Sequence, residues 1–467
     1  MTSLDKIDLA PVAPPAAPTG TRHLADELAE TLKLAVPIAL TQLGQIAMMT
    51  TDIAMIGRFG SEAVAAAALA TTVYFVSFTF GMGLVSAVAP LAAQAFGARN
   101  PRRIRRSLRV GLWAALFVAL PMMALSFRGE QILLMLGQSP VAADLAQQYL
   151  FGLAWSILPA LWFLAIRGFM SAINRPEPIL WITLAAIPAN ALLVYLLLYG
   201  ALGMPKLGLF GVGLATSIVN FGSFLAALWF AARRRPFRKY HVLGNFWRID
   251  WPLLRQLVVI GAPISISFLL EYGLFGAAGL LMGVISTTAL AAHQIALQIA
   301  AILFMVPFGI SIAATVRVGH AIGRRDASGV LRAGMVATWL GIAIGAALTL
   351  AVILGRFEIA TIFLGESTDA AAELSATLLL VGSTFFIADG IQTIAAGSLR
   401  GINDTRVPLL FATVSYWLIG FPCAWWLAFE TALGAVGVWI GLSVGTAVYA
   451  TLLLLRFRSL AQRLVFQ

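Results

Sequence analysis

The sequence predicts an all-α integral membrane protein with twelve transmembrane helices in two pseudo-twofold-related six-helix bundles and both termini in the cytoplasm. Three observations lead to this prediction: an apolar composition, basic residues confined to alternate loops, and an internal repeat. Of the 467 residues, 60% are hydrophobic and 11% are charged, and the mean hydropathy is +0.91. Soluble domains average roughly 45–50% apolar and about 25% charged residues. This composition excludes a soluble enzyme, including one with a single membrane anchor.

The long apolar runs define the expected spans, because a helix of about 20 mostly apolar residues crosses a bilayer. We place them near residues 34–56, 66–95, 110–127, 148–172, 179–199, 209–232, 253–284, 289–316, 334–355, 373–399, 408–428 and 433–455.

The N-terminal residues differ from the rest of the chain. Residues 1–30 are expected to be a disordered or interfacial tail, since the first twenty are rich in alanine and proline and include Asp5 and Asp8. Residues 23–33 are predicted to be an amphipathic segment at the membrane surface before the first span. The expected organisation is then an N-lobe (31–232), a basic cytoplasmic linker (233–252), a C-lobe (253–458) and a C-terminal tail (459–467).

Basic residues fall in every second loop. All but five of the 31 lysine and arginine residues lie in segments on one side of the predicted helices, the exceptions being Arg58, Arg128, Arg167, Lys206 and Arg356. Cytoplasmic loops carry such an excess of positive charge. The net charge of +11 therefore indicates topology and not nucleic-acid binding.

An internal repeat divides the chain into two equal parts. When each residue is aligned with the one 226 positions later, Pro37 meets Pro263, Gly57 meets Gly283, Gly83 meets Gly309 and Gly97 meets Gly323. With six spans each, both halves enter the membrane in the same direction, so the axis relating them runs along the membrane normal. Two equivalent bundles facing each other across a cleft are expected.

Three acidic residues lie inside apolar spans: Asp52, Glu271 and Asp389. A carboxylate at the bilayer centre costs roughly 2.5–3.5 kcal/mol even on insertion scales, so each should face a partner or a watery cavity. We interpret them as exchangeable sites for a proton, a sodium ion or an organic cation. The alternatives are a protonated, hydrogen-bonded packing role and, for Asp52, an interfacial position.

Polar neighbours add candidates. Asn190 and Thr216 would supply oxygens to a hard cation near Asp52, although interhelical hydrogen bonding is equally compatible with their positions. His293 and Gln294 are candidates for substrate contact, with capping or an interface role as the alternative. Arg167 is interpreted as structural.

Several segments resemble the multidrug and toxic compound extrusion (MATE) transporters, namely TDIAMIGRFG, AAHQIALQIA leading to VRVGHAIGRRD, and AAGSLRGINDTRVP. The resemblance extends over residues 30–460 and implies the NorM-type branch, with two six-helix bundles that open alternately. It implies coupling-ion binding at Glu271 and Asp389, and a related role for Asp52 beside Asn190. Some sodium-coupled relatives carry a tyrosine where this chain has Phe385, a further candidate for substrate contact, and this favours protons over sodium.

The resemblance implies secondary active export of lipophilic and cationic compounds by proton or sodium antiport. Apart from the coupling ion, which would be a proton or a sodium ion at Glu271 and Asp389, we expect no cofactor. No structural metal is expected either, since Cys423 is the single cysteine. Partners would be organic cations, other xenobiotics and the lipid bilayer of the bacterial inner membrane, and a monomer is expected. The alternatives are a lipid-linked precursor flippase and an integral-membrane lipid transferase. No nucleotide-binding motif is recognised, so the energy is expected to come from an ion gradient. The protein is not expected to be an enzyme.

Overall fold

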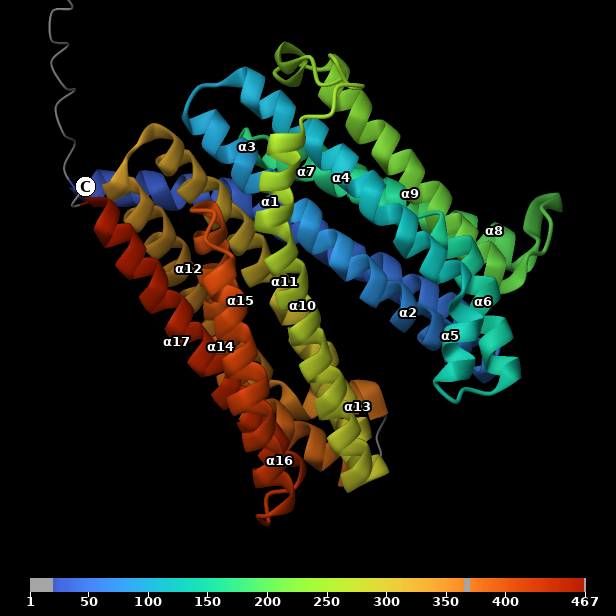
Figure 1. Ribbon diagram of the computed structural model, residues 1–467. Coiled ribbons are helices and arrows are strands. Elements are labelled where there is room, and N and C mark those ends of the chain that lie inside the picture. Colours follow the sequence, from blue (N-terminus) through green and yellow to red (C-terminus); the bar gives the residue numbers. More distant parts are fainter. Residues whose placement is uncertain (1–19, 365–369, 466–467) are drawn as a thin grey trace, which may run out of the picture.

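The computed structural model describes residues 20–364 and 370–465, and these residues form helices joined by short loops (Figure 1). The predicted disorder of residues 1–19 lies outside the described residues. The first half contains α1 (Gly20–Gly57), α2 (Ser61–Ser86), α3 (Val88–Gly97), α4 (Pro101–Phe127), α5 (Gly129–Met135), α6 (Pro140–Ala154), α7 (Ile157–Ala172), α8 (Glu177–Tyr199), η1 (Ala201–Gly203) and α9 (Gly208–Arg233). The second contains η2 (Phe237–Tyr240), α10 (Trp251–Ile285), α11 (Thr287–Arg324), α12 (Ala327–Leu354), α13 (Arg356–Leu364), α14 (Ala370–Gly401), α15 (Arg406–Ala412), η3 (Thr413–Gly420), α16 (Phe421–Phe429) and α17 (Ala435–Val465).

The predicted membrane spans are confirmed. Among the described residues, 11 helices are long and apolar enough to cross a membrane, and α6 with α7 forms a twelfth span bent by 44°. Three spans are less regular than the sequence predicted. The second contains a break at Ala87 between α2 and α3, the fourth is the bent pair, and the eleventh contains the π-helix η3.

The predicted surface segment over residues 23–33 differs from the structure. These residues are the first turns of α1 and continue into the span without a break. Glu27 explains the difference, because its carboxylate accepts two hydrogen bonds of 2.8 Å from Arg317 of α11. An ion pair to another long helix holds this segment in the bundle.

Matching turns at the helix ends show the duplication locally. Arg99 and Arg325, which are 226 residues apart, both adopt positive φ, at 53° and 59°. The next residue caps the following helix in each half, since Asn100 accepts from the Arg103 amide at 3.0 Å and Asp326 accepts from the Gly329 amide at 2.8 Å. A side-chain oxygen at this position satisfies an otherwise unpaired amide at the helix start.

The interface between the halves repeats in the same way. A Cβ atom on Gly83 would lie 2.4 Å from Cα of Ser265, and one on Gly309 would lie 2.9 Å from Cα of Ala39. Since Gly83 corresponds to Gly309 and Ala39 to Ser265, these are one contact made twice. Self-complementary contacts of this kind are what a twofold axis produces. In each contact the glycine lets two helices approach at backbone distance, α10 against α2 and α1 against α11.

Hydrogen bonds follow the same symmetry. Gln94 donates to the carbonyl of Gly401 at 2.9 Å, and Nε2 of His320 lies 2.6 Å from the carbonyl of Ala172. Gln94 also accepts from Asn403 at 2.9 Å. All these contacts lie next to the arginine-rich loops, which the charge bias assigns to the cytoplasm.

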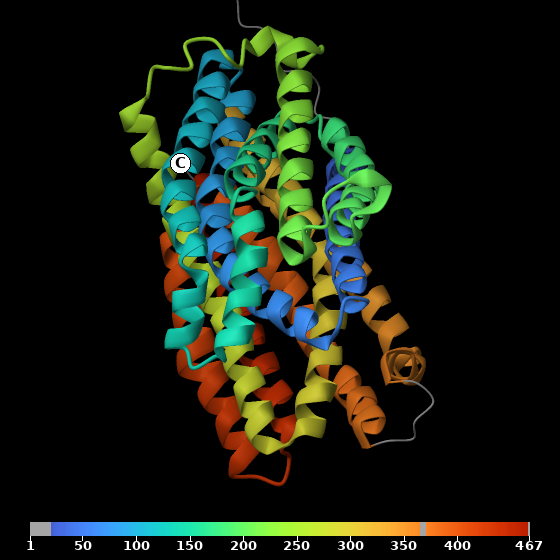
Figure 2. The same ribbon diagram turned by 90° about the vertical axis from the view of Figure 1, so that its right-hand side faces the viewer.

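The two halves lie close together around α1, α3, α10 and α11 and diverge toward α5 and α6 on one side and α16 on the other (Figure 1). Seen at 90° to this view, the long helices of both halves follow roughly one direction (Figure 2). The structure is therefore closed at the arginine-rich, cytoplasmic end.

Candidate coupling site

The second half places two of the three predicted acids together. Gln392 of α14 donates from Nε2 to Oε1 of Glu271 at 2.9 Å and to Oδ1 of Asp389 at 2.8 Å. Tyr416 of the π-helix η3 donates from its hydroxyl to Oε1 of Gln392. One amide thus joins carboxylates from α10 and α14, and a tyrosine from a third helix fixes the orientation of that amide.

The sequence-based prediction missed Gln392 and Tyr416. Gln392 lies three residues after Asp389, and such residues share one face of a helix; this spacing was the signal available for Gln392. Tyr416 had no comparable signal, because its approach depends on the packing of η3 against α10 and α17.

Burial determines what this pair can do. Asp389 is 7% exposed and Glu271 is half-buried. Two like charges in such an environment disfavour double ionisation, so binding of one proton or one cation, which leaves the pair with a single negative charge, is favoured. A hollow of about 20 Å³ lies against Glu271 and Gln392, which is room for roughly one water molecule.

In the part of the chain that the structure describes, this site offers a cation few oxygens besides those of the two carboxylates. No group of three or more His, Cys, Asp or Glu side chains that could hold a metal occurs among the described residues. The oxygen of Gln392 is already occupied by Tyr416, and Phe385 packs edge-on against Phe275 and Trp439 without contributing an oxygen.

The first half holds a smaller acidic site. Asp52 of α1 accepts from Asn190 of α8 at 2.5 Å and from Thr216 of α9 at 3.4 Å, and its side chain is 6% exposed. The structure thus brings together the three residues predicted to cluster here. Oδ1 of Asn190 is buried without a partner among the described residues. This free acceptor beside a carboxylate is positioned to accept a hydrogen bond from a protonated or cationic group.

The candidate substrate contacts are placed differently. His293 is fully buried, with Nδ1 accepting from Nε1 of Trp439 at 3.2 Å, and Phe385 is 2% exposed. Both are enclosed within the second half in this conformation, so neither faces an incoming substrate here. Gln294 is exposed. Arg167 is 6% exposed and donates to Gln42 of α1 at 2.5 Å, which fits the structural role expected of it.

These features define a class of protein: a two-bundle membrane protein whose apolar helices enclose acidic sites that an ion can neutralise. The MatE family model matches residues 37–196 and 263–426, one match in each half. The chain belongs to the MatE family, and it is a multi-pass protein of the bacterial inner membrane.

Named relatives agree with this assignment. The chain is 66% identical to the Probable multidrug resistance protein NorM of Bradyrhizobium diazoefficiens over 467 residues, covering 100% of both chains. It is 58% identical to the protein of the same name from Rhodopseudomonas palustris, covering 96% of this chain and 94% of that one. A solved structure described as the outward-facing conformation of a multidrug resistance MATE family transporter superposes with a TM-score of 0.85 at 19% identity, covering 96% and 99%.

Proposed function

We propose that the protein exports lipophilic and cationic toxic compounds by secondary active transport, with proton entry driving export. The observation that carries the proposal is the Glu271–Gln392–Asp389 cluster, an acidic pair whose charge is buried but adjacent to a small hollow. The names of the relatives support the substrate class.

The physical basis is competition for charge. A buried acidic pair binds a proton or a cationic substrate more favourably than it remains doubly ionised. If occupancy by one excludes the other, and if the affinities differ between the two states of the protein, then the ion gradient drives substrate in the opposite direction. The close backbone contacts between the halves shut the cytoplasmic end, so substrate would be released on the outer side.

The alternative of a lipid-linked precursor flippase has less support. Such a substrate carries phosphate groups, which would need basic residues between the bundles. Arg167, a basic residue within a span, is instead buried against Gln42. We further propose that the protein acts as a monomer and without catalytic chemistry of its own.

The test is efflux of a cationic dye from proteoliposomes with a proton gradient or a sodium gradient imposed separately. We expect export to follow the proton gradient and to be insensitive to sodium at clamped pH. Export that follows sodium alone would contradict proton coupling, and the absence of export with either gradient would contradict the proposed function.

A further inference from the structure

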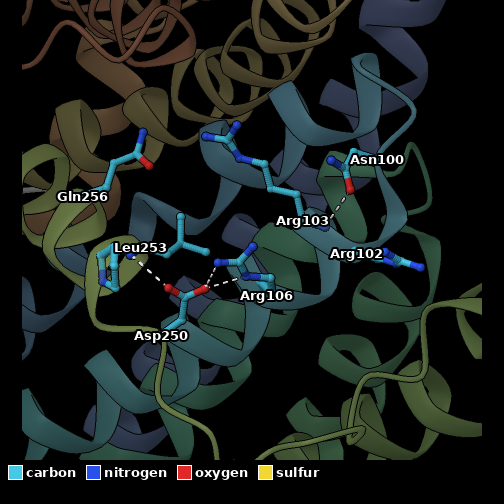
Figure 3. A pocket seen from close by; sticks show the side chains of 8 residues that line it. Asn100, Arg102, Arg103, Arg106, Asp250, Leu253 and Gln256 are labelled. Atoms are coloured by element: carbon cyan, nitrogen blue, oxygen red, sulfur yellow. Dashed lines mark hydrogen bonds and ion pairs between the residues drawn. The ribbon is translucent and has the colours of Figure 1, made fainter. Parts of the chain in front are cut away.

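A basic hollow of about 420 Å³ lies at the closed end of the molecule, between the first turns of α4 and α10 (Figure 3). It joins the two halves, because Arg106 of α4 donates to Asp250, the residue that caps α10, at 2.5 Å. Arg103 is directed toward the side of Gln256, whereas Arg102 points away from α10 (Figure 3). A volume of this size is in the range of small-molecule sites.

The charge of this hollow is not balanced. Asp250 pairs with Arg106, while Arg103 forms no ion pair with any residue of the part that the structure describes. The α4 N-terminus adds positive character, since the amide groups of a helix start favour anions. The hollow is therefore suited to a group with several acceptor oxygens, which arginine binds in a fork geometry.

The position of the hollow indicates the source of that group. Trp247 and Trp251 flank the start of α10 and are 85% and 63% exposed, and exposed tryptophans are enriched at the depth of lipid headgroups. Basic pockets between transmembrane helices on the cytoplasmic side bind anionic headgroups. We propose that the hollow binds the phosphate of an anionic phospholipid through Arg103 and Arg106.

The bound headgroup would contact both halves. When the halves separate at the cytoplasmic end, α4 and α10 no longer contribute to one site, so the lipid binds the closed state in preference to the open one. A ligand with such a preference shifts the population toward the state that it binds.

The experiment measures the distance between two spin labels in a Cys423→Ser background. One is at Arg175, in the loop before α8 of the first half, and the other is at Ser328, in the first turn of α12 of the second half. Anionic phosphatidylglycerol nanodiscs should raise the closed-to-open ratio at least threefold over phosphatidylcholine nanodiscs. Arg103→Gln should remove this difference, and the matched variant Arg102→Gln should keep it. Equal ratios in both lipids, or equal loss in both variants, would overturn the proposal. If inorganic phosphate in phosphatidylcholine nanodiscs reproduces the shift, free phosphate and not lipid is the ligand.

A second feature, independent of the first, lies beneath the coupling site. Two hollows of about 20 Å³ each, with room for roughly one water molecule apiece, follow each other through the second half. One reaches Glu271, and the other reaches Asp404 in the loop after α14. Both are lined by Ser267, Ala396, Arg400 and Tyr449.

Arg400 stands between the two hollows. Its guanidinium lies 4.9 Å from the ring centre of Phe268, and within the described residues its side chain forms no ion pair. None of its nitrogens is among the buried atoms that lack a partner. Its donors therefore face space that water can enter, and the hollows on either side provide that space.

A hydrated route to Glu271 raises a physical difficulty. If the carboxylate exchanged protons with the cytoplasm while the outer side was open, protons would cross without export. A fixed positive charge in a narrow pathway repels protons and cations. We infer that Arg400 is an electrostatic barrier that keeps Glu271 from exchanging protons with the cytoplasm in this conformation; the inference rests on the proposed role of Glu271.

The test is proton leak into proteoliposomes in the absence of any substrate, followed with an internal pH dye. Arg400→Gln should raise the leak at least tenfold, and Arg400→Lys should not, because it keeps the charge. Ser267→Leu added to Arg400→Gln should return the leak to the wild-type rate by filling the hollows, whereas Ser267→Ala should leave it high. Arg456→Gln, which removes a charge beside Asp404, is the control and should not leak.

Two results would overturn the inference: an Arg400→Gln protein that inserts normally but shows no raised proton leak, or a proton leak that Ser267→Leu does not reduce. The same assay distinguishes failure of the Arg400 inference from failure of the proposed role of Glu271. If Arg400→Gln leaks protons equally with and without Glu271→Gln, then the proton route does not include Glu271. If Arg400→Gln does not leak protons but still exports with the proton gradient, only the role of Arg400 as a barrier is contradicted.

Discussion

The two halves share a backbone plan but differ in their charges. In the second half, Glu271 and Asp389 are held by a single amide, and in the first half Asp52 is held by an amide and a hydroxyl. The position equivalent to Glu271 in the first half is Gln45, and that equivalent to Asp52 in the second is Ala278. The difference teaches that the contacts between the halves stayed symmetric after duplication while the ionisable positions did not.

The largest effect should come from the second half. Glu271→Gln removes the charge that a proton neutralises, so gradient-driven export should fall by a factor of about 100 or more, at the upper end of typical coupling free energies. The measurement is dye efflux from proteoliposomes at equal protein content. Glu373→Gln changes an exposed acid at the start of α14, the helix that carries Asp389, and should be without effect. Wild-type export by the Glu271 variant would contradict the assignment.

A smaller loss is expected in the first half. Asp52→Asn leaves a side chain that still fits between Asn190 and Thr216, so the protein should fold and export at a rate lowered about tenfold, which corresponds to roughly 1.4 kcal/mol. Efflux rates of this variant and of Glu271→Gln in one preparation provide the check. Equal losses in both variants would remove the proposed difference between the halves.

The next effect in size should come from Gln392, whose amide joins the two acids. Gln392→Leu removes the donor to both acids, and a lost hydrogen bond to a charged group costs about 1.5–3 kcal/mol. We therefore expect the pH of half-maximal export to shift upward, because the ionised forms lose their donor and protons bind more tightly. Gln392→Glu would instead add a third acid, and an unchanged pH profile in the leucine variant would show that the amide has no part in proton binding.

The smallest effects should test the symmetry. Gly83→Ala and Gly309→Ala each insert a methyl group into an equivalent backbone contact, and overpacking of this kind costs about 1–3 kcal/mol. Because the contacts are related by the twofold axis, the two variants should lower the melting temperature by similar amounts. A strong loss in one and none in the other would show that the interface is not equivalent in practice. Gly276→Ala, where a Cβ meets nothing within 4 Å, is the control.

Much of this architecture was predictable because its signals are local or periodic. Apolar runs defined the spans. Two of the glycine pairs that recur after 226 residues, Gly83 with Gly309 and Gly97 with Gly323, lie at contacts between the halves, whereas Gly57 and Gly283 do not. The bend between α6 and α7 and the π-helix η3 were not predictable, since both depend on packing between helices distant in sequence. The same reason explains the candidate site: Asp52, Glu271 and Asp389 stood out as charges in apolar surroundings, whereas Tyr416 was one aromatic residue among many.

The amide of Gln392 has only two hydrogens, and Glu271 and Asp389 share that one nitrogen. When either acid takes up a proton, its need for the amide falls and the other acid is held more firmly in its charged form. One side chain thus connects the two carboxylates, so a change at either acid is passed to the other through Gln392.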